Sequence, residues 1–127
     1  MKIRYGMAAA LIALSLGGCA TITALQQVAG TAVTPTQALL AANAFDAIES
    51  GATAFLVYCK TTPADSTCSA ANRREVIKDT RAGRAARNQI ETSIQSSSSI
   101  PATIYNTLVA AVTNLRASPA ASYAGAQ

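Results

Sequence analysis

This chain of 127 residues contains no histidine and no tryptophan, and aromatic residues make up only 5% of it. Histidine is the commonest general base and metal ligand, so its absence excludes Ser-His-Asp and Cys-His catalytic arrangements. Half of the residues are hydrophobic, but many of these are alanine, which favours helices and buries little surface. We therefore expect one small helical domain that needs a disulfide, an anchor or a partner to support its core.

Motifs for reaction chemistry are missing as well. The sequence has no glycine-rich phosphate loop, and its serine run, Ser96-Ser97-Ser98-Ser99, lacks the context of a catalytic nucleophile. Asp46 and Glu49 lie one helical turn apart, but no histidine accompanies them as a partner. The sequence predicts no enzyme activity, no catalytic residue, no cofactor and no metal site.

The amino terminus has the pattern of a secretion signal. Lys2 and Arg4 form a positive segment, and residues 7–16 form an apolar one. Ten residues make a helix of about 15 Å, half the hydrocarbon thickness of a bilayer. This length is typical of a signal-peptide core and too short for a comfortable transmembrane span.

The next residues, Leu16-Gly17-Gly18-Cys19, resemble the lipobox of bacterial lipoprotein precursors, with Gly17 a less usual choice than Ala or Ser. The resemblance covers only the first 20 or so residues. It implies cleavage before Cys19, so that residues 1–18 are the signal peptide. It also implies a diacylglycerol thioether on Cys19 and acylation of the new amino terminus with a fatty acid such as palmitate.

Two other outcomes remain open for the leader. Cleavage after Ala20, as in an ordinary secretory leader, would discard Cys19, and an uncleaved leader would act as a membrane anchor. If Cys19 is lipidated, the protein is exported and tethered to the periplasmic face of a bacterial membrane. Ala20, in place of Asp, resembles the enteric sorting pattern for the outer membrane.

The remaining chain has three stretches with helical periodicity. Thr34, Pro35 and Gln37 have the spacing of a capping box at a helix start, and Ser69 is a candidate cap for the second helix. The predicted segments are a tether over 19–33, helices over 35–58, 70–95 and 101–116 within a domain over 34–116, and a flexible tail over 117–127. Because the turn between the first two helices is short, they must form an antiparallel hairpin, with Phe45 about level with Gly83.

Cys59 and Cys68 bracket that turn. In an exported protein, two cysteines at this spacing indicate a disulfide that closes a loop of about ten residues. A thioredoxin-type motif would have two intervening residues, and a zinc site would need more ligands. The predicted fold is therefore all-α: a disulfide-stapled helical hairpin that a third helix completes as a small bundle.

The second helix concentrates positive charge. Five of its basic residues spread over about 140° of its circumference, with Arg87 just beyond. A binding role would use Arg74, Lys78, Arg81 and Arg84 to contact an anionic lipid or an acidic envelope protein. Alternatively the charges are satisfied internally: Glu75 with Lys78, Arg87 with Glu91, and Asp46 and Glu49 with Arg81 and Arg84. The six basic residues are Arg73, Arg74, Lys78, Arg81, Arg84 and Arg87.

These observations predict a small non-enzymatic cell-envelope lipoprotein that acts by contact with the membrane surface or with an envelope partner. Export argues against nucleic acid as a partner. The alternative is an oligomeric structural module, in which the third helix packs against another copy. Such a module could be encoded by a phage or plasmid and block a receptor or assist lysis.

Overall fold

The computed structural model describes residues 27, 28, 30 and 33–124, which form a bundle of three helices. The predicted signal peptide and Cys19 lie outside the described residues. None of the described helices is long and apolar enough to cross a membrane.

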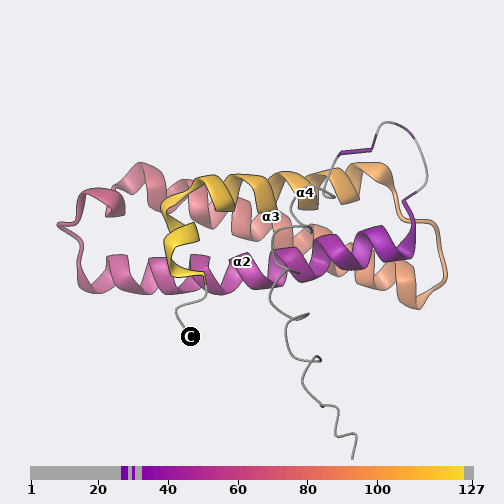
Figure 1. Ribbon diagram of the computed structural model, residues 1–127, viewed down its shortest axis with the longest axis horizontal. Coiled ribbons are helices and arrows are strands. Elements are labelled where there is room, and N and C mark those ends of the chain that lie inside the picture. The colour runs from indigo at the N-terminus through magenta and orange to yellow at the C-terminus, as the bar shows by residue number, and fades with distance from the viewer. Residues whose placement is uncertain (1–26, 29, 31–32, 125–127) are drawn as a thin grey trace, which may run out of the picture.

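Helices α2 (Pro35–Thr61) and α3 (Ala70–Gln95) run antiparallel, and α4 (Ala102–Ala117) packs along both of them (Figure 1). The turn between α2 and α3 lies at one end of the bundle and the linker between α3 and α4 at the other. A short 3-10 helix, η1 (Ser66–Cys68), lies within the turn. The predicted all-α architecture is confirmed.

The predicted caps position both hairpin helices. The Thr34 hydroxyl accepts a hydrogen bond from the Gln37 amide (3.3 Å), and the Gln37 side chain accepts one from the Thr34 amide (3.1 Å), which completes the capping box. The Ser69 hydroxyl caps α3 by accepting from the amide of Asn72. α2 ends at Thr61, three residues later than predicted, because the Thr61 hydroxyl and the Thr62 amide both donate to the Tyr58 carbonyl.

The core lies where the three helices meet. Phe45 from α2 is fully buried, and its ring packs directly on Gly83 of α3, as the predicted register requires. The apolar face of α4 is buried within the same chain, so a contact between copies would have to use another surface. The largest fully buried side chains are Tyr105, Phe45, Phe55, Ile90, Leu108, Leu115, Val76 and Val112, with Cys59 and Cys68.

The expectation of a flexible tail from residue 117 is wrong for the described part of it. Ala117 ends α4, and the 3-10 helix η2 (Pro119–Tyr123) folds back onto α2 and α4 (Figure 1). Gly51 makes this possible: a Cβ there would lie 2.7 Å from the Ala124 nitrogen and 2.8 Å from the Ala120 oxygen. The glycine in the middle of α2 therefore serves the close approach of the C-terminal segment.

The predicted tether is also shorter than residues 19–33. The Asn106 side chain accepts a hydrogen bond from the Val28 amide and donates one to the Val28 carbonyl, both at 3.0 Å. Val33 is buried and forms a β-bridge with Ile100. The chain therefore joins the folded domain at Val28, because the backbone there finds partners on α4 that no local pattern shows.

Replacing Asn106 with leucine should release this segment. Leucine has a similar volume but cannot bond the Val28 backbone, so two hydrogen bonds, each worth about 0.5 to 1.5 kcal/mol, would be lost. We expect faster amide exchange at Val28 and easier proteolysis before residue 33, with the melting of the bundle little changed. Asn88→Leu, at an exposed site on α3, is the control. An unchanged amide exchange rate at Val28 would contradict the role given to the two Asn106 hydrogen bonds.

Candidate functional site

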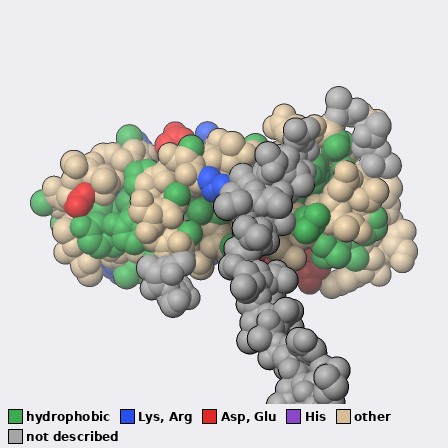
Figure 2. All heavy atoms as spheres, in the orientation of Figure 1, with side chains coloured by type: hydrophobic (Ala, Val, Ile, Leu, Met, Phe, Trp, Pro, Cys, Tyr) green, Lys and Arg blue, Asp and Glu red, His purple; other side chains and the backbone are tan. Residues whose placement is uncertain are grey.

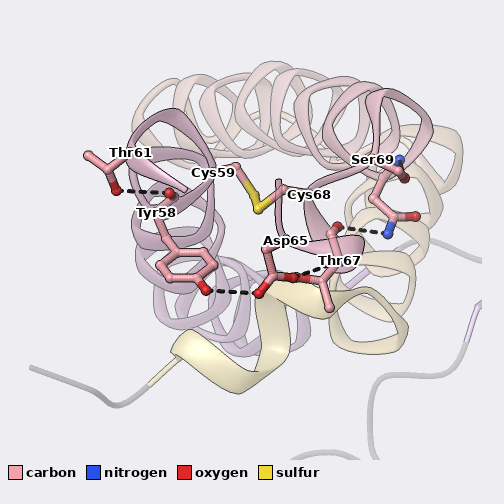
Figure 3. The surroundings of a disulfide bond; sticks show 8 residues. Tyr58, Cys59, Thr61, Asp65, Thr67, Cys68 and Ser69 are labelled. Atoms are coloured by element: carbon pink, nitrogen blue, oxygen red, sulfur yellow. Dashed lines mark hydrogen bonds between the residues drawn. A yellow bond between two sulfur atoms is a disulfide. The ribbon is translucent and has the colours of Figure 1, made fainter. Parts of the chain in front are cut away.

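The disulfide predicted between Cys59 and Cys68 is present, with the two Cα atoms 5.2 Å apart. Both cysteines are buried, and the bond joins the last turns of α2 to η1 (Figure 3). It holds together the end of the hairpin from which the cationic side chains described below project.

A hydrogen-bond network fixes the loop beside the disulfide (Figure 3). The Asp65 carboxylate accepts bonds from the amide (2.8 Å) and hydroxyl (2.6 Å) of Thr67 and from the Tyr58 hydroxyl (2.9 Å). The bonds from Thr67 and then Tyr58 hold the pKa of Asp65 below its ordinary value. The bond to Asp65 in turn raises the pKa of Tyr58. These polar groups satisfy one another's hydrogen bonds and hold the turn against the end of α2.

Two of the α3 arginines are neutralised by α2. Arg84 pairs with Glu49, and Arg87 pairs with Asp46 (3.0 Å) and with Glu91 (2.8 Å). The predicted pairing of Arg87 with Glu91 is confirmed. The expected pairing of Asp46 and Glu49 with Arg81 and Arg84 is made in part: Glu49 does pair with Arg84, but Asp46 pairs with Arg87. The helices are antiparallel, so the residue one turn before Glu49 on α2 faces the residue one turn after Arg84 on α3.

Three of the four predicted binding residues keep their charge available. Arg74, Lys78 and Arg81 are exposed on α3 and form no ion pair among the described residues, so the expected pair between Glu75 and Lys78 is not made. Arg73 is half-buried, with its Nε shielded from solvent.

Sequence reasoning missed one further cation. Lys60 lies in the last turn of α2, is exposed and is likewise unpaired among the described residues. It lines the same groove as Arg81 and Arg84, which the hairpin register alone could have indicated. We call Lys60, Arg74, Lys78 and Arg81 the basic face.

The outer groove between α2 and α3 holds two hollows. The one nearer the turn, here the turn-side groove, has a volume of about 370 Å³ and an apolar floor between cations. Val57 on its edge is 59% exposed. Its lining residues are Thr53, Leu56, Val57, Lys60, Ile77, Thr80, Arg81 and Arg84.

The second hollow, here the linker-side groove, lies toward the start of α2 and has a volume of about 300 Å³. Arg87 pairs with both Asp46 and Glu91 there, so the groove's charged lining residues, one cation and two carboxylates, leave no unpaired positive charge in it. Its apolar lining includes Leu39, Ile90 and Ile94. The contrast leaves the turn-side groove as the part of the hairpin with unbalanced positive charge.

Two of the three acidic residues of α3 lie on the side toward α4. Glu75 and Asp79 line a cleft with Asn114 of α4, whose side chain donates to Asp79 (3.2 Å). Across the part of the chain that the structure describes, no three Asp, Glu or Cys side chains gather closely enough to hold a metal ion. In the half of α3 nearer the turn the charges are thus segregated, with Glu75 and Asp79 toward α4 and the cations that are unpaired among the described residues away from it.

The face shown in Figure 2 has a different character. Hydrophobic side chains gather over the end of the bundle that carries the turn between α2 and α3, and few Lys or Arg side chains interrupt this face. The Tyr123 ring of η2 packs against the rings of Phe55 and Tyr58, with centroid distances of 5.7 and 5.4 Å. The unpaired cations of the basic face suit binding of an anionic group.

Comparison with protein-family models, curated proteins and solved structures finds no match to this chain.

Proposed function

We propose that the chain is a small non-enzymatic lipoprotein of the bacterial cell envelope, anchored through Cys19 and acting by contact with the membrane surface or an envelope partner. The observation that carries the proposal is the order of Lys2, Arg4, an apolar stretch and Leu16-Gly17-Gly18-Cys19. The buried disulfide fits an oxidising compartment such as the periplasm. The unpaired cations supply a surface through which contact could be made.

The intact mass of the protein from a membrane fraction tests the anchor. We expect the mass of residues 19–127 plus one S-diacylglyceryl group and one N-terminal fatty-acyl group, less two hydrogens for the disulfide. Cys19→Ala removes the thioether sulfur, so the mass of this variant should show no diacylglyceryl group. A soluble wild-type product that begins at Thr21, or an uncleaved chain, would overturn the lipoprotein proposal.

An oligomeric structural module is the second candidate. Leu39 and Leu40, near the start of α2, are 50% and 41% exposed, which leaves apolar surface for a second copy. Sedimentation of the detergent-solubilised protein over a range of concentrations distinguishes the two candidates. A dimer that Leu39→Ser and Leu40→Ser dissociate would favour the oligomer, and a monomer at every concentration would exclude it.

A further inference from the structure

The strongest unused feature of the molecule is the charge imbalance along the outer groove of the hairpin. In the linker-side groove, Asp46 and Glu91 offset Arg87. In the turn-side groove the charged lining residues are Lys60, Arg81 and Arg84, and of these only Arg84 has an ion-pair partner among the described residues, Glu49. Unneutralised cations close together repel one another, so they favour an anionic surface that brings phosphates to them.

Apolar side chains accompany those cations. Val57 is 59% exposed, and Leu56 and Ile77 are half-buried on the floor of the turn-side groove. From Arg74 to Arg81 the cations of α3 extend over about 10 Å. Aliphatic groups set among Lys and Arg on one helix face are typical of elements that lie in the interface of an anionic membrane.

The point at which the chain joins the bundle limits where this face can go. Asn106 fastens Val28, so eight residues, 20–27, separate Cys19 from the domain, and the nine backbone steps from Cys19 to Val28 reach at most about 32 Å. If Cys19 carries the lipid anchor, as the proposed function requires, the bundle stays beside the bilayer at high effective concentration. The short connection favours the lipid surface over a distant protein as the occupant of the face.

We infer that the basic face docks on an anionic phospholipid surface, with Lys60, Arg74, Lys78 and Arg81 meeting phosphate groups and Val57 entering the interface. Attachment is then at two places, the anchor before Val28 and the hairpin beside the turn. The linker-side groove, with two carboxylates and one guanidinium among its lining residues, takes no part in docking. The inference rests on the proposed function only for the proximity that the anchor gives.

A tryptophan placed on the docking face reports the contact, because the natural chain has none. Full-length Val57→Trp would be incorporated into vesicles of phosphatidylcholine alone or mixed with phosphatidylglycerol. We expect a blue shift and quenching by brominated lipid only in the anionic vesicles, reversed by high salt. Leu40→Trp, on an exposed position of α2 outside the turn-side groove, is the matched reporter and should not respond.

Charge variants identify which cations dock. Arg81→Gln and Lys78→Gln should each weaken docking about fivefold, as expected for one cation near an anionic surface. Arg116→Gln makes the same change of charge beside the Ala44 and Ala47 groove and should have no effect. Hydrogen exchange of the unsubstituted chain, with protection over 53–60 and 77–84 in anionic vesicles, checks the result without a reporter.

Three results would overturn the inference. The first is an equal fluorescence change of Val57→Trp in the neutral and the anionic vesicles, and the second is equal weakening of docking by Arg116→Gln and by Arg81→Gln. The third is a fluorescence change in neutral vesicles that grows with the density of protein on the vesicle. The last would indicate contact between copies. Failure of the anchor is distinguishable, because an unanchored chain does not float with neutral vesicles, whereas an anchored chain that does not dock floats with both kinds.

Discussion

Replacing Phe45 with alanine should lower the free energy of unfolding by about 3 to 5 kcal/mol, because a fully buried ring is removed from a thin core. The described core holds only two Phe side chains, and many of its other residues are alanine, so little can move in to fill the cavity. Chemical denaturation of the purified protein measures the loss. A change below 1 kcal/mol would contradict the central place given to this ring.

Substitutions at Gly83, on which the Phe45 ring packs, test the same contact from the other helix. A Cβ on Gly83 would overlap the Phe45 ring, so Gly83→Ala should destabilise the protein by about 1 to 3 kcal/mol, even though alanine favours helices by about 1 kcal/mol over glycine. In the Phe45→Ala background the overlap is gone, and Gly83→Ala should become stabilising. Ala85→Gly, at an exposed site of α3, calibrates the helix term. A stabilising Gly83→Ala in the natural chain would show that the ring lies elsewhere.

The hairpin was predictable because its signals are local or follow from one register. Thr34 with Gln37 and Ser69 set the helix starts, and the short turn forces the antiparallel arrangement. Once the helices are antiparallel, Phe45 and Gly83 follow from counting outward from the turn.

The two ends of the domain were not predictable in this way. Residues 117–124 are rich in Ala and Ser and show no helical period, yet Ala120 is fully buried. The visible clue was Gly51, whose missing side chain admits η2, but a sequence does not say what approaches a glycine. The attachment of Val28 depends on the Asn106 side chain, 78 residues away.

The candidate site was partly predictable. The cations of α3 could be placed on one side of a helix from their spacing, but which of them stay unpaired depends on the hairpin register. That register pairs Glu49 with Arg84 and Asp46 with Arg87, and leaves Arg81 without an ion pair in the described part of the chain. A shift of one helical turn would have neutralised a different pair, and the basic face would then have been located elsewhere along the hairpin.

Removing the disulfide should have the next largest effect. Replacing Cys59 and Cys68 together with alanine should cost about 2 to 3 kcal/mol, the value that loop-closure entropy gives for a ten-residue loop. For a domain of this size the melting temperature should then fall by about 10 to 20 °C. Differential scanning calorimetry measures the change, and Cys19 is left in place so that the variants differ from the natural chain only at Cys59 and Cys68.

The single variants separate the bond from the packing of the two side chains. If closure of the loop is what stabilises, Cys59→Ala, Cys68→Ala and the double variant, all measured under reducing conditions, should lose the same amount, since either substitution breaks the bond. The reduced natural chain should match them. If the losses of the two single variants add up to the loss of the double variant, the buried sulfur atoms stabilise by packing alone.

Because both cysteines are buried, reduction of the folded protein should be slow and should accelerate only under conditions that open the hairpin. The disulfide and the basic face share this end of the hairpin, so slow reduction would also show that the surface carrying Lys60 and Arg74 stays folded at neutral pH.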